Sequence, residues 1–147
     1  MLIVLCGIPG SGKTTLSEEL AKKYNANIYH FDEYPGAHHP QKADQAHRQM
    51  WSDIAQDLKN GNNVVCDDLH TKKIWRSNIL NSLKDKECKK ILVVLDTKLD
   101  ECLKRNSNRK HKLPDFILHD LFRKYEHPSL DEGWDEIIRG DILWIIK

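Results

Sequence analysis

Residues 7–14 read Gly7-Ile8-Pro9-Gly10-Ser11-Gly12-Lys13-Thr14 and match the phosphate-binding pattern G-x-x-x-x-G-K-S/T at every fixed position. An apolar run, Leu2–Cys6, precedes this segment and a helical pattern follows from Thr15, which is the strand–loop–helix context that the pattern requires. Glycines let the backbone N–H groups of such a loop turn inward, where they and the helix N-terminus form a nest for a polyphosphate. We therefore expect a nucleoside triphosphate to bind here.

The residues of this loop have separate expected tasks. Lys13 should reach the β and γ phosphates, and the Thr14 hydroxyl should hold Mg²⁺. An ordinary glycine-rich turn is the alternative, but here all fixed positions and both flanks match. The residues expected to bind the nucleotide are Gly7, Pro9, Gly10, Ser11, Gly12, Lys13, Thr14 and Thr15.

The bulk properties point to one cytoplasmic domain. A chain of 147 residues is long enough to bury a real hydrophobic core. Its net charge of +1 gives no general attraction to nucleic acids or membranes, so any basic surface must be local. No apolar run is long enough for a membrane span, and no basic region marks a signal peptide. The four cysteines include no C-x-x-C pair, which indicates reduced thiols.

Strand and helix patterns alternate along the chain. Strands are expected at Leu2–Cys6, Asn27–Phe31, Asn63–Cys66 and Lys90–Leu95, and helices at about 14–24, 42–59, 71–83, 98–106 and 115–125, with Ile74, Ile79, Leu80 and Leu83 facing inward. Two apolar runs across Gly140-Asp141 suggest a closing hairpin, or a single strand with an extension. The alternation predicts a three-layer α/β/α P-loop NTPase fold with a mainly parallel sheet of about five strands.

Aspartates follow the expected strands, at the sheet edge where ligands of parallel α/β sheets gather. Asp32 is a candidate general base for a substrate hydroxyl, with Glu33 as the fallback and a turn cap as the structural alternative. Asp67 is a candidate Mg²⁺ ligand, directly or through water, and Asp68 competes for that role. Asp96 follows the fourth strand at the same edge.

Two arginines, Arg105 and Arg109, lie four residues apart where an expected helix runs into a basic segment. Guanidinium groups that face the same way could neutralise the charge on a transferring phosphoryl group. A solvated basic helix face is the common alternative. Beside a phosphate-binding loop we favour a lid, over residues 105–114.

Other P-loop machines and metal sites fit the chain less well. Thr97-Lys98-Leu99-Asp100 resembles the guanine-reading motif of GTP switches, but the segment Asp67–Thr71 lacks the glycine of D-x-x-G, and Lys98–Asp100 also fits the first turn of a helix. A motor needs a second domain or oligomer-forming extensions, for which 147 residues leave little room. The eight histidines include no helical H-x-x-x-H pair with a carboxylate, so His38-His39 and His47 form a poor metal site, and we favour loop surface or substrate contact for them.

The chain resembles small kinases related to the polynucleotide 5′-hydroxyl kinases, and also to zeta-toxin-like and tRNA kinases. Phe31-Asp32-Glu33-Tyr34 is similar to their D-D-Y-R-like segment, and Arg105 and Arg109 match their R-x-x-x-R lid. Residues 125–128 and 131–137 resemble their F-E-x-P…E-G-F closing segment. The resemblance covers nearly the whole chain, and it implies ATP as donor and Asp32 as general base.

Two features depart from this resemblance. Residues 67–71 and Arg76 match the group's D-x-T-N-L motif and its following arginine only loosely. Pro35 or Gly36 stands where those kinases place an arginine that grips the acceptor's phosphate. The grip would then have to come from His38, His39, Arg48 or Lys72.

We predict that residues 1–147 form a single P-loop kinase domain that uses ATP and Mg²⁺. It would transfer the γ-phosphoryl group to a hydroxyl, foremost the 5′-OH end of RNA or DNA. The expected catalytic residues are Lys13, Asp32, Arg105 and Arg109, and the expected metal ligands are Thr14 and Asp67. A small-molecule, nucleoside or tRNA-linked kinase is the alternative, followed by an ATP-binding regulatory or toxin-like module. The sequence indicates neither the base of the donor nor the oligomeric state.

Overall fold

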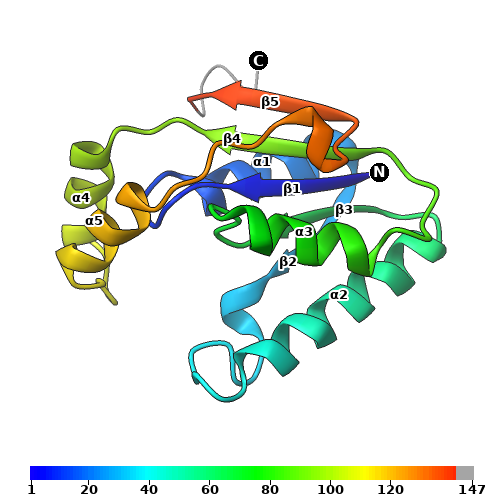
Figure 1. Cartoon of the computed structure of the whole chain (residues 1–147), viewed down its shortest axis with the longest axis horizontal. Coiled ribbons are helices and arrows are strands. Elements are labelled where there is room, and N and C mark those ends of the chain that lie inside the picture. The colour runs from blue at the N-terminus through cyan, green and yellow to red at the C-terminus, as the bar shows by residue number, and fades with distance from the viewer. Residues whose placement is uncertain (142–147) are drawn as a thin grey trace.

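A five-stranded sheet forms the centre of the computed structural model, which describes residues 1–141. Its strands lie in the order β2-β3-β1-β4-β5, and every neighbouring pair is parallel. Their C-terminal ends therefore share one edge, and the arrowheads of β1, β4 and β5 in Figure 1 point toward α4 and α5. The bounds are β1 (Leu2–Cys6), β2 (Ala26–His30), β3 (Asn63–Asp67), β4 (Lys90–Leu95) and β5 (Glu136–Gly140).

Helices cover both faces of this sheet, so the predicted three-layer α/β fold is confirmed. The helices are α1 (Lys13–Tyr24), α2 (Ala43–Lys59), α3 (Lys73–Ser82), α4 (Leu99–Ser107) and α5 (Asp115–Arg123), with 3-10 turns η1 (Phe31–Glu33) and η2 (Leu130–Glu132). Successive side chains of the buried strands point to opposite faces of the sheet. This alternation divides the core into one cluster under α1 and another under α2 and α3.

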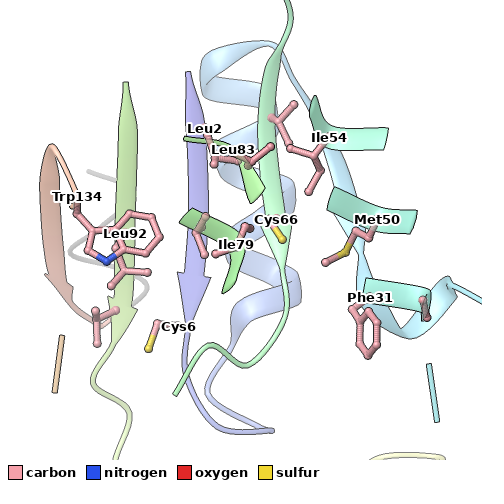
Figure 2. Packing of buried hydrophobic residues seen from close by; sticks show 14 residues of the cluster. Leu2, Cys6, Phe31, Met50, Ile54, Cys66, Ile79, Leu83, Leu92 and Trp134 are labelled. Atoms are coloured by element: carbon pink, nitrogen blue, oxygen red, sulfur yellow. The ribbon is translucent and has the colours of Figure 1, made fainter. Parts of the chain in front are cut away.

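Side chains of α2 and α3 meet the sheet in the larger cluster, shown in Figure 2. Met50 and Ile54 come from α2, and Ile79 and Leu83 come from α3; all four are fully buried. On the opposite face the second cluster is closed by leucines of α1. A third, smaller cluster joins Ile8 to α4 and α5, and so fixes the phosphate-binding loop beside these two helices.

Three expectations about the elements need correction. The second strand ends at His30, so Asp32 lies on η1 and not directly at a strand end. Ile74 does not face the core: its exposed fraction is 59%, because it lies on the outer side of the first turn of α3. β5 pairs in parallel with β4, and the expected hairpin partner at residues 142–146 lies outside the described residues.

A buried ion pair ties the closing segment to α3. Arg76, with no exposed surface, donates from Nε and Nη2 to Glu132 at 2.9 and 2.8 Å, and from Nη1 to the His70 carbonyl at 3.0 Å. Burial acts to lower the pKa of Arg76, but the paired carboxylate raises it above its usual value. The arginine noted in the sequence thus has a structural partner, and its guanidinium lies away from the cleft described next.

Candidate phosphate-transfer site

The phosphate-binding loop connects β1 to α1 at the C-terminal edge of the sheet. Gly10 and Gly12 adopt positive φ angles of 84° and 103°, which suit glycine. A Cβ atom on Gly10 would lie 2.5 Å from the Cys102 carbonyl oxygen, so α4 approaches too closely for any side chain there. These glycines let the loop wrap the start of α1 while packed against α4. The loop therefore has the backbone that a phosphate nest needs.

Lys13 extends back along the loop, and its Nζ donates a hydrogen bond to the Ile8 carbonyl at 3.1 Å. Burial lowers the pKa of Lys13, whereas the negative charges of Asp67 and Asp68 act to raise it. Asp32 adds a weaker contribution of the same sign. Three carboxylates therefore act on this ammonium group.

Thr14 and Asp67 meet where α1 begins and β3 ends. The Thr14 hydroxyl donates to Asp67 Oδ2 at 3.3 Å, and His30 Nδ1–H donates to the same oxygen at 2.8 Å. A hydroxyl beside a carboxylate is the kind of oxygen set that Mg²⁺ prefers, usually with several waters and phosphate oxygens completing the octahedron. The residues present therefore fit the metal, and Thr14 and Asp67 are the residues that would hold it.

Asp68 lies on a different path from Asp67. It accepts hydrogen bonds from His47 Nε2 at 2.9 Å and from the Leu69 N–H at 2.8 Å. Burial acts to raise the pKa of Asp68, but these bonds and the nearby His70 hold it below its usual value. The geometry thus separates the two aspartates, with Asp67 beside Thr14 and Asp68 beside α2.

Asp32 lines the same cleft from η1 and is largely exposed, with His38 Nε2 3.7 Å from its Oδ1. It has room to meet a substrate hydroxyl. Glu33, the alternative base, is not among the described residues that line the cleft. Asp32 is therefore the better placed of these two carboxylates.

Arg105 and Arg109 both line the cleft from the end of α4 and the following loop. Arg105 donates from Nη1 to the Gly10 carbonyl at 3.2 Å and from Nε to Glu101 at 3.2 Å. The loop after α4 is closed by Asn106, which is fully buried. Its Nδ2 donates to the Leu113 carbonyl at 2.7 Å, and its Oδ1 accepts from the Leu113 N–H at 3.1 Å.

A single cleft of about 1430 Å³ connects all these groups. It runs from the phosphate-binding loop and the Arg105–Arg109 segment to a space between α2 and α3. The charges of its lysine, arginine and aspartate side chains balance, because four are cationic and four are anionic: Lys13, Arg48, Arg105 and Arg109 against Asp32, Asp44, Asp67 and Asp68. The cleft is therefore large, but it is not a uniformly basic track.

The contacts of three histidines around the cleft were not predicted from the sequence. His30 contacts Asp67, and His47 contacts Asp68 and stacks on Phe31 with ring centroids 3.7 Å apart. His70 is buried, and its Nδ1–H donates to the Leu5 carbonyl at 2.9 Å, while burial lowers its pKa. The available signal was position, since His30 ends a strand and His70 follows Asp67 by three residues.

The described residues contain neither a cluster of metal ligands nor a membrane-spanning helix. Within residues 1–141, no group of three or more His, Cys, Asp or Glu side chains could hold a metal ion. In the same range, no helix is both long and apolar enough to cross a membrane. All four cysteines are free, and three of them are buried.

Several curated proteins are similar to this chain in sequence. The L-seryl-tRNA(Sec) kinase of Methanococcus maripaludis is 26% identical over 145 residues, and protein kti12 of Schizosaccharomyces pombe is 28% identical over 152 residues. These matches cover 92% and 91% of this chain but only 56% and 54% of the relatives, so the chain spans about half their length. A probable gluconokinase of Xenopus tropicalis is 27% identical over 171 residues, covering all of this chain and 90% of that protein.

Solved structures share the fold at lower identity. Kti12 of Chaetomium thermophilum in complex with ADP-AlF3 matches with a TM-score of 0.74 and 17% identity, covering 96% of this chain and 89% of that one. A gluconokinase from Sinorhizobium meliloti 1021 matches with a TM-score of 0.69 and 19% identity, covering 98% and 86%. The specific likeness to polynucleotide kinases expected from the sequence is not among these relatives. Residues 1–138 match the family described as chromatin associated protein KTI12, and the chain therefore belongs to the KTI12 family.

Proposed function

We propose that this chain is an ATP- and Mg²⁺-dependent kinase domain that phosphorylates a hydroxyl carried on RNA. The observation that carries the proposal is the single cleft in which Lys13, Thr14 and Asp67 face the same space as Asp32. Phosphoryl transfer requires little covalent chemistry from the protein, so positioning and charge neutralisation are what the site must supply. This cleft offers both.

The donor half is built on the phosphate-binding loop. The loop amides and Lys13 would bind the β and γ phosphates, and Thr14 and Asp67 would hold Mg²⁺. The metal ion, when bound, neutralises charge that develops on the phosphate oxygens. Arg105 and Arg109 would reach the transferring group from the opposite side. Removing either arginine should lower turnover strongly, on the order of 10³-fold by analogy with arginine fingers.

The acceptor half lies beyond the loop, between η1, α2 and α3. Asp32 would accept the proton of the attacking hydroxyl. The cleft of about 1430 Å³ extends past the phosphate-binding loop into the space between α2 and α3, so it has room for an acceptor beside the nucleotide. Similarity to an L-seryl-tRNA(Sec) kinase supports an acceptor carried on RNA. That acceptor could be a 5′-OH end, as the sequence suggested, or a hydroxyl attached to a tRNA.

A small hydroxy acid is the second candidate acceptor. It is favoured by the similarity to a probable gluconokinase, the relative matched over 90% of its length. The balanced charge of the cleft is compatible with this candidate as well. The two candidates share the donor half and Asp32, so only the acceptor distinguishes them.

The test supplies ATP labelled at the γ-phosphate with four acceptors: seryl-tRNA, uncharged tRNA, a 5′-OH RNA oligonucleotide and gluconate. We expect label on at least one RNA and none on gluconate, with Asp32→Asn lowering transfer and Glu33→Gln serving as the matched control. Label on gluconate alone would establish the second candidate. ATP binding without label on any acceptor would contradict the proposed activity and favour an ATP-binding regulatory module.

A further inference from the structure

Trp75 is a large aromatic side chain on the acceptor side of the cleft, and it does not pack into any of the hydrophobic clusters of the described residues. It lies in the first turn of α3, is partly buried and lines the cleft. It is absent from the three hydrophobic clusters found in residues 1–141. Trp134 and Trp51 differ, since both belong to or pack against the larger cluster. Packing therefore accounts for those two indoles but not for Trp75.

The indole of Trp75 makes a cation–π contact with Lys72. Lys72 Nζ lies 4.9 Å from the ring centroid. Lys72 is not among the described residues lining the cleft, whereas Trp75 is. This cation–π contact is therefore made by a residue that does not itself line the cleft. A ring fixed in this way can present its remaining surface to a ligand with little further loss of conformational freedom.

Amide groups follow Trp75 along the side of α3 that lines the cleft. Asn78 and Asn81 come three and six residues later and also line the cleft. The opposite wall is formed by α2, where Trp51 and His47 stack with centroids 5.5 Å apart. The groove between the two helices therefore offers flat aromatic surface together with neutral hydrogen-bonding groups.

The charges of the cleft argue against recognition of the acceptor through several backbone phosphates. Among the four lysine and arginine side chains lining the cleft within residues 1–141, three belong to the proposed donor half: Lys13, Arg105 and Arg109. Arg48 alone is left for the acceptor. A site that followed an RNA backbone by its phosphates would need several cations. Stacking on aromatic side chains recognises RNA without them.

We propose that Trp75 is a stacking platform for a nucleobase of the acceptor, and that Asn78 and Asn81 offer hydrogen bonds to the edge of that base. This inference rests on the proposed RNA acceptor. It assigns the groove between α2 and α3 as the acceptor's base-binding subsite, next to the hydroxyl that reacts near Asp32. Ile74, exposed in the same turn and also lining the cleft, extends the apolar surface.

Equilibrium binding tests the platform without requiring transfer. The probes are a labelled six-nucleotide adenine RNA and a ribose-phosphate hexamer of the same length that lacks bases, both measured by fluorescence anisotropy. We expect the wild type to prefer the base-bearing probe. Trp75→Ala should weaken binding of that probe about 5- to 150-fold, the range found when a stacking aromatic is removed. Binding of the abasic probe should not change.

Matched variants separate stacking from general damage. Trp75→Phe keeps an aromatic face and should retain most of the preference, whereas Trp75→Leu keeps only apolar bulk and should lose it. Phe116→Ala removes an aromatic residue, 69% exposed on α5, outside the cleft, and should have no effect. Binding of a fluorescent ADP derivative should be the same in all variants, because the donor half is untouched.

The outcomes also separate this inference from the proposed activity. A wild type without preference for the base-bearing probe overturns the platform, and so does a Trp75→Ala variant that loses both probes equally. A Trp75→Ala variant that impairs only gluconate use overturns it as well. If the binding pattern is as expected but no RNA is phosphorylated, the base subsite stands and the proposed kinase activity is wrong.

Discussion

Replacing Asn106 with leucine tests whether the loop after α4 positions Arg109. The change removes both hydrogen bonds to the Leu113 backbone, at 2.7 and 3.1 Å. Each contributes roughly 0.5–1.5 kcal/mol net, so about 1–3 kcal/mol is lost. If this energy holds Arg109 over the transferring phosphoryl group, kcat/KM should fall about 5- to 150-fold.

A double-mutant cycle tests whether Asn106 affects kcat/KM through Arg109. Asn106→Leu, Arg109→Ala and the combined variant are compared by steady-state kinetics, with urea unfolding measured in parallel. We expect strong non-additivity, because a loop that positions Arg109 has no function once that side chain is absent. Asn108→Leu, in the same loop but exposed, is the control and should behave like the wild type. Additive losses, or a loss of unfolding free energy with kcat/KM unchanged, would refute the positioning role.

The remaining predictions concern stability, metal binding and thiol reactivity. Glu132→Gln leaves the buried Arg76 without its partner and should lower the free energy of unfolding by about 3–5 kcal/mol in urea titrations. Burial acts to raise the pKa of Glu132, but Arg76 holds that pKa below 4.5. The ion pair therefore contributes its full stabilising free energy above pH 4.5, and this contribution is lost as the pH falls through the lowered pKa of the folded state. The free energy of unfolding of the Glu132→Gln variant should not show this loss at acid pH. Asp67→Asn should raise the Mg²⁺ concentration needed for ATP binding, measured by calorimetry, whereas Asp68→Asn should leave it nearly unchanged. Among the thiols, that of Cys88 should react first with a thiol reagent in the native protein, because burial raises the pKa of the other three.

The central sheet could be predicted because its strands are short apolar runs between well-marked helices. Strand pairing in parallel follows from that alternation alone. The end of β2 was misplaced by one residue, because Phe31 is apolar and extends the hydrophobic pattern into η1. The burial of Ile74 was wrongly predicted for the same reason. Apolar residues at helical spacing are expected to be buried, but Ile74 lines the open cleft from the first turn of α3.

The candidate site could be predicted only where a motif fixes the backbone. Gly10 and Lys13 belong to such a motif, and Asp32 follows a strand that the fold brings to the same edge. The contacts of His47 and Asn106 depend on which helices meet across the cleft, and sequence spacing carries no information about that. Trp75 shows the same limit, since an indole within a helix is expected in a core until the surrounding clusters are known.

The alternation of side chains along β3 decides which of Asp67 and Asp68 lies beside Thr14. Val65 lies in the cluster under α1, while Cys66 lies in the cluster under α2 and α3. Because side chains alternate, Asp67 continues the face of Val65 and reaches Thr14 on α1, and Asp68 is directed to His47 on α2. A carboxylate on the wrong face cannot take over a metal position without a shift of the strand by one residue, which would expose the core face of β3. Asp68 should therefore fail to rescue Asp67→Asn even at high Mg²⁺ concentration.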